Sequence, residues 1–146
     1  MCIRDSFKHK LLDAIYTRWA QEWYNNPTCC LSKYFLPTPS KTKSKTLLKL
    51  NRGQMRTLIE LITGHNNLNY FQSKIHPEIS GNCRFCEEED ETFEHLLNDC
   101  PCFLIARRDL LQNNTITNTL AWDPKTLLKF SELPSISQAL TDNHAD

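Results

Sequence analysis

The chain has 146 residues, enough for one small domain or for a piece of a larger protein, and 40% of its residues are hydrophobic. Its net charge is zero, but residues 1–82 carry +7 and residues 83–146 carry −7, so only the first part suits a polyanionic partner. No apolar run approaches the roughly 20 residues that span a bilayer, and the charged first residues lack the apolar segment of a secretory signal. We therefore expect an intracellular protein of the cytoplasm and nucleus, without membrane contact.

The first predicted element is an amphipathic helix over residues 7–24. Residues 1–6 (MCIRDS) resemble the translation of a sequencing adapter, and we leave them out of the fold prediction. Apolar residues then recur at three- and four-residue spacing and make one helical face: Leu11, Leu12, Ile15, Trp19 and Trp23. The two tryptophans could stack on nucleobases, but such a pair more often belongs to a core, which is what we expect here.

Residues 25–50 are predicted to form a basic, proline-containing linker. Leu36-Pro37-Thr38-Pro39 favours an extended, irregular loop. No acidic residue lies between Lys33 and Arg56, so this stretch is either a solvated flexible loop or a strip that contacts the phosphates of RNA or DNA. The candidate contacts for nucleic acid are Lys41, Lys43, Lys45, Lys49, Arg52 and Arg56.

A helical domain is predicted over residues 51–112. Asn51 and Gln54 form a capping-box pattern at the start of a helix that should end before Gly64. Its expected apolar stripe is Met55, Leu58, Ile59 and Ile62. His65 after it is expected to be structural, and a short helix over 67–75 should follow.

The strongest motif is C-x2-C-x8-H-x4-C. It consists of three cysteines and one histidine within eighteen residues: Cys83, Cys86, His95 and Cys100. Thiolates and an imidazole at such spacing can complete a tetrahedral shell around Zn²⁺. A full set of four protein ligands leaves no open position, so we expect a structural and not a catalytic metal.

The spacing also predicts local geometry. On a continuous helix, His95 and Cys100 would lie about 140° apart, so the helix should unwind near Asn98-Asp99 to return Cys100 to the site. Asp90 or Thr92 could cap that helix, and Cys102 is a weaker rival ligand. The acidic run 87–91 is expected to be solvated.

Other cysteines and the chain end carry less information. The adjacent Cys29 and Cys30 are expected to be two small apolar side chains and not a vicinal disulfide. Residues 103–112 should be helical, and residues 113–146 are predicted to form a helical tail in which Asp123-Pro124 begins one helix.

Several of these motifs together resemble the tail that follows the reverse transcriptase and RNase H domains of non-LTR retrotransposons of the jockey/I-like group. The similarity covers most of residues 10–110, and its most specific parts are the Thr63-Gly64-His65 helix end and the segment from Glu91 to Pro101 that contains His95 and Cys100. The resemblance implies a zinc module that assists nucleic-acid handling within a polyprotein. It maps the zinc ligands to the four residues of the motif. The Tyr-x-Asp-Asp polymerase signature and the RNase H carboxylate set are absent from this sequence.

The sequence therefore predicts a mostly α-helical fold, a small bundle of short helices around a Cys3His zinc knuckle with an irregular Pro/Lys-rich loop. Its expected function is non-catalytic assistance to RNA or DNA binding in reverse transcription and integration. The alternative is an interaction module that docks on the upstream polymerase or RNase H domain without touching nucleic acid. An active nuclease fragment is a third and weaker hypothesis.

Overall fold

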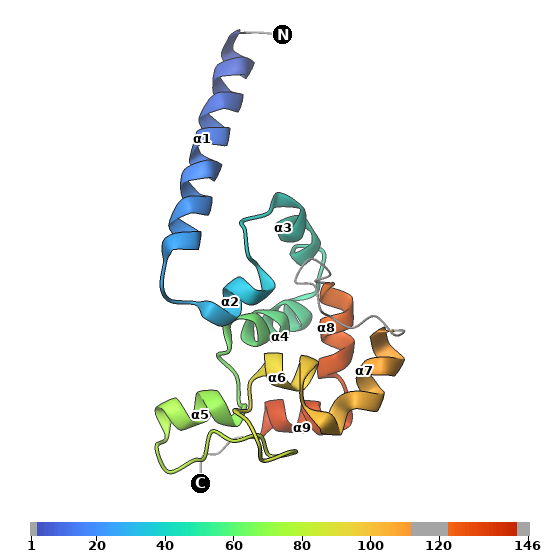
Figure 1. Ribbon diagram of the computed structural model, residues 1–146. Helices are drawn as coiled ribbons and strands as arrows, with labels where there is room; N and C mark the ends of the chain where they lie inside the picture. Colours follow the sequence, from blue (N-terminus) through green and yellow to red (C-terminus); the bar gives the residue numbers. More distant parts are fainter. Residues whose placement is uncertain (1–2, 112–122, 143–146) are drawn as a thin grey trace.

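The computed structural model describes residues 3–111 and 123–142. In these ranges the chain is mostly helical, as predicted, and Figure 1 shows one long helix extending from a cluster of short ones. The helices are α1 (Ile3–Asn25), α2 (Cys30–Phe35), α3 (Lys41–Leu47), α4 (Arg52–Thr63), α5 (Asn69–Ile75), α6 (Phe93–Asn98), the 3-10 helix η1 (Pro101–Phe103), α7 (Leu104–Leu111), α8 (Pro124–Ser131) and α9 (Pro134–Thr141). None of these helices has the length and apolarity that a membrane span needs.

The core is built from one face of each short helix that reaches it. Helix α4 contributes Leu58, Leu61 and Ile62 and packs against α2 and α8, and α6 adds its own buried side chains to the same core. Five phenylalanine rings form a continuous series through this core, with neighbouring centroids 4.9 to 6.1 Å apart: Phe35, Phe93, Phe130, Phe103 and Phe85. Such tilted and edge-to-face pairs are favourable aromatic geometries.

Helices α8 and α9 belong to this same core and do not form a separate tail. Asp123 caps α8 by accepting hydrogen bonds from two backbone N–H groups, as the Asp-Pro pair predicts. Leu127, Phe130 and Ile136 are buried in the cluster that holds α4 and α6. Residues 113–122 of the predicted tail lie outside the described residues.

Helix α4 confirms the capping prediction and corrects its apolar stripe. The Asn51 side chain accepts from the Gln54 N–H, and the Gln54 side chain returns a bond to the Asn51 N–H, which completes the capping box. Gly64 ends the helix in the left-handed region with φ 77°. Ile59, which was assigned to the apolar face, is exposed, and Leu61 is buried in its place.

The segment predicted as a linker contains two short helices. Ser40 begins α3 because its side chain accepts a hydrogen bond from the Lys43 N–H, and Leu47 packs against the core. The prolines do keep residues 36–40 out of helix. The prediction of an irregular loop is therefore wrong for Lys41–Leu47, where a serine cap converts a lysine-rich run into a helical turn.

Helix α1 forms as predicted but does not bury its apolar face. It also includes Ile3 to Ser6, the adapter-like residues. The side chains expected in the core are exposed along most of its length, among them Leu11, Ile15 and Trp19. Near its end, the Trp23 indole N–H donates to the Leu36 carbonyl over 2.8 Å, and this bond ties α1 to the segment after α2. The expected tryptophan core is therefore wrong for Trp19, because α1 extends away from the other helices (Figure 1).

Candidate metal centre

The loop between α5 and α6 brings two cysteines of the motif to one side. Asn82 and Asp90 form an isolated antiparallel bridge across its base. Above this bridge the Cys83 N–H donates to the Glu89 carbonyl at 2.7 Å, and the Glu87 N–H donates to the Cys83 carbonyl at 2.8 Å. These bonds close a tight turn over the C-x2-C segment, which places the Cys83 and Cys86 sulfurs in the same cluster.

Helix α6 and the break after it supply the other two side chains. Thr92 caps α6 by accepting from the His95 N–H at 3.0 Å. The helix ends at Asn98, and the N–H groups of Asp99 and Cys100 both donate to the His95 carbonyl, over 2.9 and 2.8 Å. Two N–H groups that share one carbonyl show that the helix unwinds here, as the spacing of His95 and Cys100 predicts. The unwinding places Cys100 on the side of the helix that His95 faces.

The structure brings all four predicted ligands together. The sulfur and nitrogen atoms of Cys83, Cys86, His95 and Cys100 all lie within 4.8 Å of one another, and this group could hold a metal ion. The Cys83 and Cys100 sulfurs are 4.0 Å apart, and the Cys86 sulfur is 3.3 Å from the His95 Nε2. Cys102 lies outside the group, because its exposed thiol donates to the Phe85 carbonyl at 3.2 Å. Cys29 and Cys30 are also free thiols and not a disulfide.

The thiols of the cluster differ in their affinity for protons. Burial raises the pKa of the Cys83 thiol, and it raises the pKa of Cys100 to about 12. Cys86 is different, because a hydrogen bond from the Glu88 backbone stabilises its thiolate and lowers its pKa to about 7. A metal ion would therefore have to displace protons from Cys83 and Cys100, whereas Cys86 is the thiol closest to ionisation at neutral pH.

A carboxylate contacts the His95 ring at the nitrogen that faces away from the cluster. The Glu89 Oε2 lies 3.1 Å from the His95 Nδ1, while the other ring nitrogen, Nε2, points at the Cys86 sulfur. A carboxylate at Nδ1 favours the tautomer that carries its proton there, which leaves the Nε2 lone pair for a metal. The sequence predicts only a solvated loop for Glu89, because a run of consecutive acids contains no signal that separates this residue from its neighbours.

Glu91, the last residue of the acidic run, is fully buried, so the prediction of a solvated run is wrong at this position. Arg84 binds it through two parallel contacts, Nε to Oε1 at 2.8 Å and Nη2 to Oε2 at 3.1 Å. The Asn69 N–H donates to the same carboxylate at 2.6 Å. Paired contacts with both oxygens are the strongest geometry for an arginine and a carboxylate, and they compensate the cost of burying Glu91.

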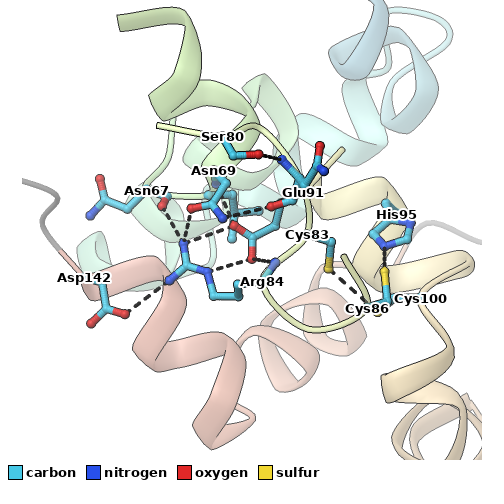
Figure 2. Close-up of polar contacts among 12 residues, drawn as sticks. Asn67, Asn69, Ser80, Cys83, Arg84, Cys86, Glu91, His95, Cys100 and Asp142 are labelled. Carbon is cyan, nitrogen blue, oxygen red and sulfur yellow. Dashed lines mark hydrogen bonds and ion pairs between the residues drawn. The ribbon is translucent and has the colours of Figure 1, made fainter. Parts of the chain in front are cut away.

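Arg84 also reaches beyond Glu91 to three other residues in two parts of the fold, as Figure 2 shows. Its Nη2 donates to the Asn67 carbonyl at 3.3 Å and to the Asn69 Oδ1 at 3.0 Å, both near the start of α5. Its Nη1 lies 3.2 Å from the Asp142 carboxylate at the end of α9. One guanidinium between Cys83 and Cys86 therefore links the cysteine loop to α5 and α9.

The predicted nucleic-acid contacts lie on α3, the turn after it and α4. Lys45, Lys49 and Arg52 are exposed and form no ion pair with the residues that the structure describes. Lys41 is exposed too, with its Nζ 4.3 Å from the centroid of the Tyr16 ring. The other two are engaged within the protein. Lys43 is half-buried and donates to the Phe35 carbonyl at 3.2 Å, and Arg56 pairs with Glu60 at 2.7 Å.

Gly64 and His65, which carry part of the family resemblance, are structural in this geometry. A Cβ atom on Gly64 would lie 2.9 Å from the Leu31 Cδ2, and the positive φ of this residue favours glycine as well. The exposed His65 ring makes an edge contact with Phe71, with centroids 4.9 Å apart. These contacts join the end of α4 to α2 and α5.

Comparison with protein-family models, curated proteins and solved structures gives no match. The resemblance to retrotransposon tails therefore stays a hypothesis that rests on the sequence motifs alone.

Proposed function

We propose that Cys83, Cys86, His95 and Cys100 bind one Zn²⁺ ion that stabilises the fold. The observation that supports this is the convergence of three sulfurs and one imidazole nitrogen within 4.8 Å. Such a donor set is typical of structural zinc, which takes tetrahedral sulfur and nitrogen ligands. With four protein ligands the ion has no position left for a substrate or water, so its role is structural and not catalytic.

The zinc loop itself is a poor surface for phosphate. Three thiolates around Zn²⁺ leave one net negative charge, and the exposed carboxylates of Glu87, Glu88, Glu89 and Asp90 surround it. A polyanion is repelled by this side of the domain. Any contact with nucleic acid must therefore use another surface.

The domain that this zinc centre stabilises binds the backbone of RNA or DNA through the basic surface of α3 and α4. We define this basic surface as Lys41, Lys45, Lys49 and Arg52. All four side chains are exposed, and no acidic residue lies in the chain between Lys33 and Arg56. Lysine and arginine bind phosphates by displacing condensed counterions, so exposed cations without acidic neighbours are suited to this partner.

The sequence resemblance suggests in which larger protein this activity is used. In that protein the chain is the non-catalytic C-terminal tail of a retrotransposon reverse transcriptase, and it works in the cytoplasm and nucleus beside polymerase and RNase H domains. The tail assists reverse transcription and integration by holding nucleic acid. Reduced thiols at the metal site agree with an intracellular compartment.

The test is a binding titration of the zinc-loaded protein with a labelled RNA or DNA oligonucleotide at about 50 and 200 mM salt. Phosphate contacts predict that affinity falls steeply with salt, with a slope of about 0.7 to 0.9 per contact on a logarithmic plot. Lys45→Gln with Arg52→Gln should weaken binding and reduce the slope by about two contacts. The matched control is Lys125→Gln with Lys129→Gln, which removes the same charge from exposed positions on α8. Absence of binding at low salt would refute the nucleic-acid function.

One observation favours the alternative of an interaction module. Helix α1 exposes a row of large apolar side chains at four-residue spacing: Phe7, Leu11, Ile15 and Trp19. An exposed apolar row of this kind is typical of a protein contact. If the protein binds no oligonucleotide at low salt but binds the upstream domains through α1, docking is the function and the basic surface is only solvated.

A further inference from the structure

Trp19 is an exposed tryptophan beside the basic surface. Its relative exposure is 51%, although tryptophan is usually among the well-buried residues of a folded chain. Its ring lies 5.9 Å from that of Tyr16, centroid to centroid, one helical turn earlier on α1. The indole therefore stands at the surface with an aromatic neighbour on its own helix.

A hollow of about 140 Å³ separates this part of α1 from α3. Trp19 and Trp23 line it from the α1 side, and Lys43, Ser44 and Leu47 line it from the α3 side. Trp23 is held in place because its indole N–H donates to the Leu36 carbonyl. The hollow thus has a fixed aromatic wall, and the exposed Trp19 ring lies on its rim.

Positive charges border this hollow. Lys41 places its Nζ over the Tyr16 ring, one turn from Trp19. Lys43 lines the hollow itself and donates to the Phe35 carbonyl. Lys45 does not line it but is exposed on the same short helix, one turn after Lys41. The nearest acidic residue of α1, Glu22, is paired with Arg18 at 2.8 Å. The exposed indole and the lysine beside it therefore suit an occupant that combines flat rings with negative charge.

We infer that Trp19 stacks on a base of single-stranded RNA or DNA, while Lys41 and Lys45 of α3 contact the phosphates of the same strand. This inference rests on the proposed nucleic-acid function and names the strand type that the surface takes. Exposed bases and a phosphate backbone are the two features that single-strand binding proteins use, through aromatic platforms and cationic grooves. In a duplex the faces of the bases are stacked on one another, so a duplex could contact the lysines but could not stack on the Trp19 indole.

The experiment compares two labelled strands of equal length, about 12 nucleotides, by fluorescence anisotropy with the zinc-loaded full chain. One strand carries bases, and the other is abasic and keeps only the sugar-phosphate backbone. The wild type should bind the strand with bases more tightly. Trp19→Ala should lower that affinity about tenfold, in the range of stacking on one base, and leave abasic binding unchanged. Trp19→Phe should retain much of the affinity because it keeps a ring.

Leu11→Ala is the matched control, because Leu11 is an apolar side chain of α1 with the same 51% exposure, far from the lysines in sequence. It should leave both affinities unchanged, whereas Lys41→Gln with Lys45→Gln should lower both. If Trp19→Ala binds both strands as the wild type does while the lysine variant binds weakly, stacking is refuted and the proposed function stands. Equal losses for Leu11→Ala and Trp19→Ala would also refute stacking and favour a protein contact along α1. If neither strand binds at low salt, both proposals fail together.

Discussion

Within the acidic run 87–91, neighbouring carboxylates have opposite environments. Glu91 is fully buried against Arg84, Glu89 contacts the metal-site histidine, and Glu88 is exposed to solvent. The sequence alone shows five consecutive acids and cannot distinguish them, because the partner of Glu91 is chosen by the tertiary fold. A residue in such a run is identified only by what it touches.

Glu91→Gln is expected to destabilise the domain. The substitution keeps the shape of the side chain but leaves the Arg84 guanidinium without its buried counter-charge, a loss of roughly 3 kcal/mol in the free energy of unfolding. Urea denaturation of the zinc-loaded protein measures this change in the free energy of unfolding. Glu88→Gln removes the same charge from the exposed part of the run and should change stability by less than about 0.5 kcal/mol. Equal stability of the two variants would show that the buried pair contributes nothing.

Glu89→Gln is expected to weaken zinc binding without removing a ligand. The Glu89 carboxylate faces the His95 Nδ1 at 3.1 Å, and loss of such an outer partner typically lowers metal affinity about 10- to 100-fold. Competition with a chromogenic chelator gives the affinity, and Glu88→Gln again serves as the charge control. If Glu89→Gln binds zinc as tightly as that control, Glu89 does not orient the histidine.

At the scale of elements, the features that could be predicted from sequence are local ones. The Asn51–Gln54 box, the Thr92 cap and the Asp123-Pro124 start each depend on residues within three or four positions of one another. The break after Asn98 is local in the same way. It follows from the angular positions of His95 and Cys100 on one helix.

The two elements that were predicted wrongly, α3 and the apolar face of α1, failed for different reasons. Helix α3 was missed because two prolines and a lysine run dominate its surroundings, although Ser40 is a sufficient cap. The apolar face of α1 was expected to be buried, but periodicity shows only that a face exists and not that another element covers it. Trp19 is exposed for this reason.

Gly64→Ala should destabilise the end of α4. A methyl group there would meet Leu31 at 2.9 Å and stand on a backbone with φ 77°, so we expect a loss of about 1 to 2 kcal/mol in unfolding free energy. Gly53→Ala is the control within the same helix, because the nearest atom to its Cβ is 3.5 Å away. That variant should be neutral or gain up to about 1 kcal/mol from its higher helix propensity. A Gly64→Ala variant as stable as the control would contradict the structural role of this residue.

At the scale of the whole molecule, the cysteine–histidine cluster is continuous with the helical core. Cys83 and Cys100 are buried in the same cluster as α4 and α8, and Arg84 links the cysteine loop to α5 and α9. A domain of this size has a modest core, so a metal that joined these elements would contribute much of its stability. Helix α1, which lies mostly outside the core, should be least affected by metal removal.

The central claim, one structural zinc held by four named ligands, is tested most directly by native mass spectrometry with circular dichroism of the reduced protein. We expect one zinc per chain in the wild type and loss of the metal together with much of the helicity in Cys86→Ser. Cys102→Ser should keep both the zinc and the helicity, because the exposed Cys102 thiol lies outside the cluster. A wild-type protein that keeps its helicity without zinc, or a Cys86→Ser variant that still binds one ion as tightly, would contradict the claim.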